Sequence, residues 1–278
     1  MIDNDFISEV KSGERFEFGK NWESFLNSLT DERIQVAKES LKELIQIEDL
    51  TGKTFLDIGC GSGLFSLAAR KLNANVHSID FDPTSVKCAR FLNEKFNNNG
   101  DNWKIEQGSA LDTEYIKNLP KFDIVYSWGV LHHTGNMLLA LDNAAIPIKE
   151  DGILFVSIYD DLGQVSRTWL KIKKLYNSSY IGKSLVIAFF YPYYVIRNLL
   201  EDLVKFKNPY KRYKEHKKQR GMSMVHDWKD WIGGLPFEVA TTDYIIDFYV
   251  KRGFSLKKLK PNRGGCNEFV FKKSDPQQ

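Results

Sequence analysis

The stretch FLDIGCGSGLF, residues 55–65, decides the fold that this sequence predicts. A strand pattern ends around Asp57, and Gly59, Gly61 and Gly63 follow at every second position. Glycine has no Cβ, so the chain can turn tightly here and its backbone can lie against a ligand. A helix predicted directly after the loop would direct free N–H groups and its positive dipole end at an anion. Dinucleotide folds use G-x-G-x-x-G for a pyrophosphate, so this spacing favours a ligand that carries a carboxylate instead.

Beyond this loop, strand and helix patterns alternate along the chain. Strands are predicted over 54–58, 76–80, 103–107, 122–127 and 153–159, and helices over 64–72, 83–96, 110–118 and 137–145. Strands that alternate with helices imply right-handed crossovers and a parallel sheet. A helix over 242–251 and two strands over 254–259 and 267–271 close the pattern. The sequence therefore predicts an α/β protein.

Polar segments follow three further predicted strands. The second strand, in NVHSIDFDP (75–83), ends at Asp80, whose carboxylate can accept hydrogen bonds from both hydroxyls of a ribose. QGSALD (107–112) covers the end of the third strand, and FDIVYSWGVLHH (122–133) contains the fourth strand and a polar loop. Ligands of such sheets bind outside the carboxyl ends of the strands. We therefore expect these segments to meet in one pocket.

In this order, the segments resemble the motifs of class I S-adenosylmethionine (SAM) methyltransferases, in particular the ubiquinone-biosynthesis-like and type 11 or 12 groups. The resemblance implies a Rossmann-like, doubly wound sheet of seven strands in the order 3-2-1-4-5-7-6. Its last strand is antiparallel, and a helical insert separates strand 5 from the final helix. The implied cofactor is SAM, with S-adenosylhomocysteine (SAH) as product. The resemblance assigns to the cofactor Asp57, Gly59, Cys60, Gly61, Gly63, Asp80, Phe81, Ser109, Ala110, Ser127, Trp128 and Trp22.

We divide the chain into four parts. These are N-terminal cap helices (1–48), a SAM-binding core (49–160), a basic and aromatic helical lid insert (161–240), and a final helix with an antiparallel hairpin (241–278). In the methyltransferases that this chain resembles, an N-terminal segment of this kind closes over the cofactor. The alternative for the aromatic residues of the N-terminal segment is ordinary core packing.

The charge of the chain is unevenly distributed. Its net charge is +3, but residues 163–220 hold 14 Lys or Arg and three acidic residues, so this segment carries +11 and the rest −8. Such asymmetry points to an anionic partner, with a solvated helix face as the alternative. The apolar run at 184–200 is shorter than the ~20 residues of a bilayer span. We expect a helical lid there, with peripheral membrane contact as a lesser alternative.

The cysteines and the N-terminus indicate the cellular setting. The N-terminal sequence has no apolar secretory stretch. The three cysteines, Cys60, Cys88 and Cys266, have no metal-binding spacing. We therefore expect a cytoplasmic protein without a metal centre.

Methyl transfer needs an aligned acceptor and a site that excludes water. A hydroxyl acceptor also needs a base, and histidine suits that role near neutral pH. His133 aligns with the histidine of a V-L-x-H pattern in ubiquinone-biosynthesis type enzymes, and His226 is the rival candidate. The residues that we expect to bind the acceptor are His132, Tyr159, Asp160, Trp228 and Trp231.

The sequence leaves three functions open. The first is a SAM-dependent methyltransferase acting on a hydroxyl of a small phosphate- or nucleotide-bearing acceptor, such as an activated sugar of surface polysaccharide. The second is an RNA (tRNA) methyltransferase, whose basic run KNPYKRYKEHKKQR (207–220) would follow a phosphate backbone. The third is a SAM-binding protein without turnover. The N/D-P-P-Y pattern of DNA amino methyltransferases is absent after the fourth strand, which disfavours that reaction. Oligomeric state and acceptor identity stay open.

Overall fold

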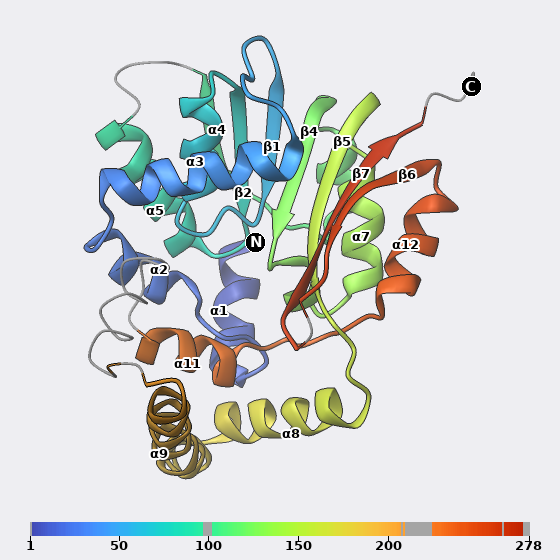
Figure 1. The fold of residues 1–278 in the computed structure, drawn as a ribbon. Coiled ribbons are helices and arrows are strands. Elements are labelled where there is room, and N and C mark those ends of the chain that lie inside the picture. The colour runs from blue at the N-terminus through green and yellow to red at the C-terminus, as the bar shows by residue number, and fades with distance from the viewer. Residues whose placement is uncertain (1, 97–101, 207, 209–223, 263, 275–278) are drawn as a thin grey trace.

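The computed structural model describes residues 2–96, 102–206, 208, 224–262 and 264–274. Their centre is a seven-stranded sheet in the order β3-β2-β1-β4-β5-β7-β6 (Figure 1). The strands β1 to β5 are parallel, and β7 runs antiparallel to both β5 and β6. The predicted strand order and the antiparallel last strand are confirmed. The strands are β1 (Thr54–Ile58), β2 (Asn75–Asp80), β3 (Trp103–Gln107), β4 (Phe122–Trp128), β5 (Ile148–Tyr159), β6 (Phe254–Lys260) and β7 (Cys266–Lys273).

Helices cover both faces of the sheet. The helices are α1 (Ile2–Ser12), α2 (Gly19–Leu26), α3 (Asp31–Ile45), α4 (Leu64–Lys71), α5 (Pro83–Phe96), α6 (Thr113–Lys117), α7 (Met137–Ala145), α8 (Gln164–Ser178), α9 (Tyr180–Val204), α11 (Met224–Gly233) and α12 (Thr242–Val250). Successive side chains of a strand point to opposite faces. Thus Phe55 of β1 packs in the apolar cluster under α3, α4 and α5, whereas Leu56 packs in the cluster under α7 and α12.

Two elements begin three or more residues from their predicted start. The helix predicted over 110–118 begins only at Thr113, because Ser109 accepts the Leu111 N–H and Asp112 caps the helix by accepting the Tyr115 N–H at 3.0 Å. Strand β5 begins at residue 148 instead of 153, since the polar residues 149–151 hide its start in the sequence. The turn at Ser109 holds the end of β3 beside the site.

The N-terminal segment lies across the carboxyl ends of the strands. The Gly19 N–H donates to an Asp82 carboxylate oxygen at 2.8 Å, and the Phe16 N–H donates to the Leu235 carbonyl at 3.0 Å. Asp82 also accepts the Thr84 N–H at 2.8 Å, as expected of the residue that caps α5. One short loop therefore fixes both a core helix and the segment above the site.

The insert forms a separate layer below the sheet, in which α11 packs on α8 and α9 lies at the outer edge (Figure 1). A third apolar cluster joins this layer to the N-terminal segment, with Phe16, Tyr176, Val186, Tyr194 and Ile232 at its centre. Among the helices that the structure describes, none combines the length and the apolar character of a membrane span.

Candidate functional site

The three glycines of the loop after β1 have different roles. All have positive φ, at 76°, 54° and 81° for Gly59, Gly61 and Gly63. A Cβ at Gly59 would lie 2.3 Å from the Val130 side chain, and one at Gly63 would lie 2.9 Å from a residue of α5. At Gly61 the nearest atoms belong to the Trp22 ring, 3.0 Å away. Two glycines therefore serve close packing of the protein on itself, while Gly61 faces the N-terminal segment with Trp22 over the loop.

Asp80 ends β2 beside this loop. One carboxylate oxygen accepts the Gly61 N–H at 2.8 Å and the other accepts the Asp82 N–H at 2.9 Å. A carboxylate has about four acceptor positions, so two remain for a ligand. Burial raises the pKa of Asp80 to about 7, although the two N–H groups and nearby Arg15 favour its charged form.

Asp57 lies below the loop and braces it. The Ser66 hydroxyl donates to its carboxylate at 2.5 Å, which joins β1 to α4. Burial raises the pKa of Asp57 to about 7, against the hydrogen bond from Ser66. Cys60 is also buried, and burial raises the pKa of its thiol well above the ordinary value. The thiol therefore stays protonated near neutral pH.

We call the surface along the glycine loop, Asp80 and the loop after β3 the groove. The predicted cofactor residues beyond Asp80 contribute to it to different degrees. The Phe81 ring lies between the Phe6 ring, 5.6 Å away edge-on, and the Arg15 guanidinium, 4.8 Å above it. Ala110 is buried, and its carbonyl accepts the Asn143 amide at 2.8 Å. Phe81 thus contacts the N-terminal segment that covers the groove, and Ala110 fixes the loop after β3.

Two further predicted cofactor residues lie at the end of β4, which neighbours β1 on the side away from β2. Ser127 is fully buried and donates its hydroxyl to the Ile58 carbonyl at 3.0 Å, so this side chain ties β4 to β1. Trp128 is 41% exposed and donates to Glu268 at 3.1 Å. Of the two, only Trp128 presents its side chain to the surface.

His133 has a fixed tautomer. Its Nδ1 donates to the Pro236 carbonyl at 2.5 Å, because a carbonyl can only accept, and this leaves Nε2 as the unprotonated nitrogen. Burial, together with the charges of Lys173 and Arg15, lowers the pKa of His133 to about 3, against the hydrogen bond to Pro236, which favours the charged form. The imidazole is therefore neutral at neutral pH.

His132 lies deeper than His133. It is fully buried, with the His133 ring 4.4 Å and the Tyr159 ring 4.1 Å from its own. Burial lowers the pKa of His132 well below its ordinary value. Its ring packs against Tyr159 at the end of β5, which favours a structural role over acceptor binding.

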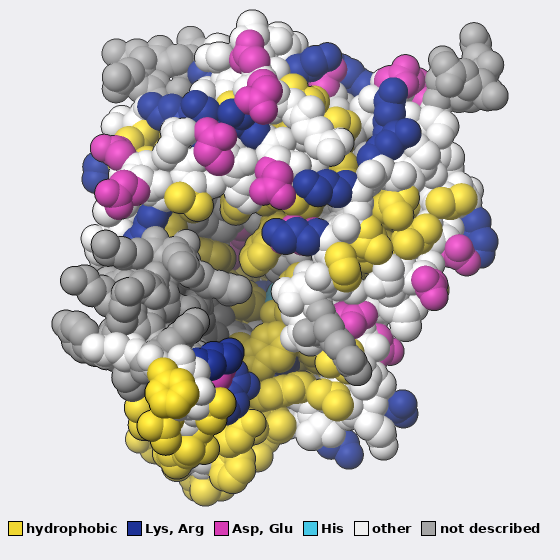
Figure 2. Space-filling view, viewed as in Figure 1, with side chains coloured by type: hydrophobic (Ala, Val, Ile, Leu, Met, Phe, Trp, Pro, Cys, Tyr) yellow, Lys and Arg dark blue, Asp and Glu magenta, His cyan; other side chains and the backbone are white. Residues whose placement is uncertain are grey.

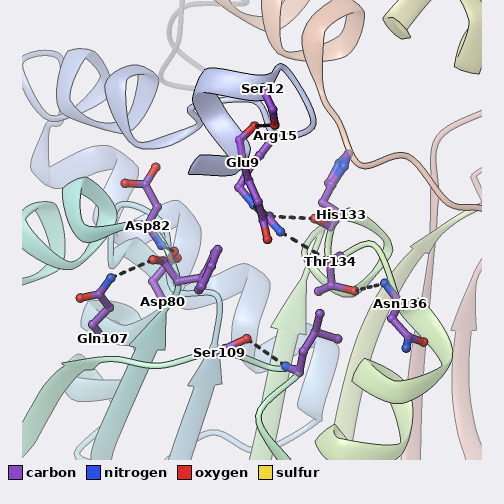
Figure 3. Close-up of polar contacts among 12 residues, drawn as sticks. Glu9, Ser12, Arg15, Asp80, Asp82, Gln107, Ser109, His133, Thr134 and Asn136 are labelled. Atoms are coloured by element: carbon purple, nitrogen blue, oxygen red, sulfur yellow. Dashed lines mark hydrogen bonds and ion pairs between the residues drawn. The ribbon is translucent and has the colours of Figure 1, made fainter. Parts of the chain in front are cut away.

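Arg15 is a site residue that the sequence did not reveal. Its guanidinium donates to the His133 carbonyl at 3.0 Å and to the Thr134 carbonyl at 3.4 Å, and it pairs with Glu9 of α1. Figure 3 shows Arg15 crossing from the N-terminal segment to the loop after β4, with Asp80 on one side and His133 on the other. Only its place in the fold distinguishes Arg15 from other arginines, so no sequence signal was available.

An open hollow of about 90 Å³ lies beyond the two histidines, at the end of β5. Aromatic side chains dominate its wall, together with one carboxylate: Tyr159, Trp169, Trp231, Phe237 and Asp160. Figure 2 shows this face of the molecule hollowed between the sheet and the helices of the insert, with histidine surface visible inside. The hollow has the apolar lining of a small-molecule site but is smaller than a typical one.

A buried cation stands behind this wall. Lys173 of α8 is fully buried, donates to the Trp231 carbonyl, and places its ammonium 4.9 Å from the Trp231 ring and 4.8 Å from the Phe237 ring. Trp228, which was also predicted to bind the acceptor, packs on α9, 5.2 Å from the Tyr194 ring. The side chain of His226 is outside the described residues, so its role stays a prediction.

The residues that line the groove have the chemistry needed to bind SAM. The glycine loop opens α4, whose first N–H groups have no partner within the helix, and Asp80 keeps two acceptor positions for ribose hydroxyls. Within the described residues no group of three or more His, Cys, Asp or Glu is placed to hold a metal ion. Sheet order, glycine loop and acidic strand end together define a class I SAM-dependent methyltransferase.

Comparison with known proteins gives the family. The methyltransferase domain family model matches residues 49–188, half of the chain, and the chain belongs to that family. The ubiquinone biosynthesis O-methyltransferase of Glaesserella parasuis is 35% identical over 108 residues, which cover 39% of this chain and 46% of that protein. The ribosomal protein L11 methyltransferase of Bacillus subtilis is 32% identical over 125 residues, 38% of this chain and 39% of that protein. The chain thus spans about half the length of the curated relatives it matches.

A solved structure shows the same fold. Magnesium protoporphyrin IX methyltransferase from Synechocystis PCC 6803, with bound SAH, aligns with a TM-score of 0.53 at 14% identity, over 87% of this chain and 83% of that one. At this identity the likeness concerns the fold. The family and the groove agree on the cofactor, which is SAM.

Proposed function

We propose that this chain transfers the methyl group of SAM to a hydroxyl of a small anionic acceptor, such as a phosphate-bearing sugar, with His133 as the base. The observation that carries the proposal is the hydrogen bond from His133 Nδ1 to the Pro236 carbonyl. It holds Nε2 ready to accept a proton. The name of the first relative, an O-methyltransferase, supports a hydroxyl as the acceptor.

Each part of the site has one task in this proposal. Bound SAM supplies a methyl group that is already activated by its sulfonium. Asp80 would hold the ribose, and the loop at Gly61 with the N-terminus of α4 would hold the carboxylate. Trp22 and the rest of the N-terminal segment exclude water. The acceptor lies in the hollow beside Tyr159, and its hydroxyl gives its proton to His133 Nε2.

The electrostatics of the site support an anionic acceptor. Both Arg15 and Lys173 lower the pKa of His133, so two cations lie close enough to influence it. A base with a pKa of about 3 is weak in the free protein, since general bases work best near the ambient pH. An anion bound near the two cations would offset their charge and so remove that part of the lowering of the His133 pKa, of which burial is the largest cause. Acceptor binding would thereby make His133 a stronger base than it is in the free protein.

The test is methyl transfer from radiolabelled SAM to matched pairs of hydroxyl compounds, with and without a phosphate, and to bulk tRNA. The phosphorylated member of a pair should show at least about tenfold lower KM, the value of one charge-assisted hydrogen bond. His133→Gln should lower kcat at least about hundredfold and leave the SAM dissociation constant unchanged. Full activity of this variant, or methylation of tRNA alone, contradicts the proposal.

A further inference from the structure

Helix α9 carries an apolar stripe on its outward face. We define the apolar stripe as Ile181, Leu185, Phe189, Ile196, Leu200 and Leu203, whose side chains are between 56% and 72% exposed. Their spacings of 4, 4, 7, 4 and 3 residues keep them on one side of the helix. At 1.5 Å per residue the stripe runs for about 33 Å. Soluble surfaces rarely leave so long an apolar band uncovered.

The opposite side of α9 already has its packing partners. Val186 and Tyr194 are buried in the third apolar cluster. A Cβ at Gly182 would lie 2.3 Å from the Leu175 carbonyl oxygen of α8, so the two helices are in close contact there. α9 is therefore held in place by one face, and the stripe is not needed for that packing.

Exposed positive charge accompanies the stripe. Five basic side chains of α8 and α9 are exposed, as is Lys205 directly after α9; the five are Arg167, Lys171, Lys174, Lys183 and Arg197. The acidic residues of the two helices are Asp202, which is buried, and Glu201, which pairs with Lys205 at 2.5 Å. Figure 2 shows the apolar and basic side chains adjoining at the lower edge, over α9. This layer therefore presents apolar and cationic surface together.

We propose that α9 lies on the surface of an anionic phospholipid membrane. The apolar stripe enters the boundary between headgroups and acyl chains, and the basic residues of α8 and α9 contact the anionic headgroups. This combination of an apolar face with Lys and Arg beside it is typical of interfacial helices. Tyr180 and Phe206, which are 85% and 97% exposed, lie at the two ends of α9, and aromatic side chains are favoured at membrane–water interfaces.

Charge argues against a second copy of this chain as the occupant. Two copies joined along their stripes would bring together two helix pairs whose exposed charged side chains are mainly basic, and like charge opposes association. A nucleic acid would match the charge but leaves the apolar stripe in water. An anionic membrane matches both properties. The proposal rests on α8 and α9 and is independent of the acceptor proposed above.

The experiment is co-sedimentation of the whole protein with vesicles of phosphatidylcholine alone or mixed with an equal amount of phosphatidylglycerol. The protein should bind the mixed vesicles and show little binding to phosphatidylcholine, because each basic residue near an anionic surface contributes about fivefold. The triple variant Leu185→Gln, Ile196→Gln, Leu203→Gln should bind at least about thirtyfold more weakly. Glutamine keeps the helix propensity, so the unfolding temperature of the triple variant should match that of the unchanged protein.

A matched control uses three exposed apolar residues on other helices. Val36, Leu138 and Val250 are 59%, 45% and 50% exposed on α3, α7 and α12, and their replacement by Gln should leave vesicle binding intact. If the triple variant unfolds, Lys183→Glu with Arg197→Glu provides the second test and should abolish the preference for phosphatidylglycerol. Unchanged binding by the stripe variant overturns the proposal. So does a dimer without vesicles, seen by analytical ultracentrifugation, that the same variant dissociates.

Discussion

SAM binding should depend on pH through Asp80. Burial raises the pKa of this carboxyl from 3.8 to about 7 in the protein without ligand. The ribose hydroxyls donate hydrogen bonds, which favour the charged carboxylate. Binding therefore requires that a protonated Asp80 release its proton. Affinity for SAM should fall as the pH drops below about 7, the value that burial sets.

The size of the effect follows from that pKa. For one group with a pKa of about 7, lowering the pH from about 8 to about 6 weakens binding about tenfold. Asp80→Asn removes the titrating group and should weaken SAM binding at least about tenfold at the higher pH, the value of one hydrogen bond to a charged group. The asparagine amide could also accept only one of the two N–H groups of Gly61 and Asp82, so one of these two hydrogen bonds is lost.

Isothermal titration calorimetry across this pH range measures both effects. Titration of SAM itself affects the unchanged protein and Asp80→Asn equally, so it cancels in the ratio of their affinities for SAM. Titrations in two buffers of different ionisation enthalpy should show proton release near pH 7 for the unchanged protein and less for Asp80→Asn. Asp247→Asn, with a side chain 71% exposed on α12, is the control and should behave as the unchanged protein. An affinity ratio that stays constant with pH would refute the reasoning.

Three further changes test the cover, the glycine loop and the far end of the sheet. Arg15→Met removes two hydrogen bonds to the loop after β4, so hydrogen exchange over 15–26 should speed up several-fold, about 1 kcal/mol of local stability. Gly63→Ala should destabilise by at least about 1 kcal/mol more than Gly253→Ala in urea unfolding, because both glycines have φ near 80° but only Gly63 has a neighbour within 3 Å of the new Cβ. Burial would raise the pKa of Asp123, yet a lysine and a threonine that donate to it lower the value to about 2. Asp123→Asn should therefore cost about 2 kcal/mol at neutral pH and little near pH 2, since this contribution is present above about pH 4 and is lost as the pH falls.

The strands were predictable because each of them leaves a local mark in the sequence, whereas their order in the sheet came from the resemblance to class I methyltransferases. Alternating strand and helix patterns and the closing hairpin give the seven strands, and the spacing of Gly59, Gly61 and Gly63 marks the turn that follows β1. The start of β5 left no such mark, because residues 149–151 are polar and the strand there lies at an irregular register with β4.

The N-terminal cover was expected from the resemblance, but the contacts that hold it over the site could not be predicted, for a different reason. Arg15 and Phe81 are 66 positions apart, and their contact depends on how the N-terminal segment lies across the finished sheet. The same holds for the bond from His133 to Pro236, which joins two loops 103 positions apart. A sequence shows residue types and local spacing, whereas these contacts need the tertiary fold. The sequence also assigned one purpose to three glycines, and only the positions of their neighbours separate packing from ligand approach.

Salt separates the two anionic partners that this chain is proposed to bind. The cations near His133 are sheltered, since Lys173 is fully buried and the Arg15 side chain is 13% exposed. Those of α9, such as Lys183, stand in solvent. Screening acts strongly on exposed charges, for which the Debye length falls from about 10 Å at 0.1 M to about 3 Å at 1 M salt, and much less on buried ones. Raising salt across this range should therefore release the protein from anionic vesicles while the KM for a phosphorylated acceptor changes little. A parallel loss of both would mean that the exposed basic residues also bind the acceptor.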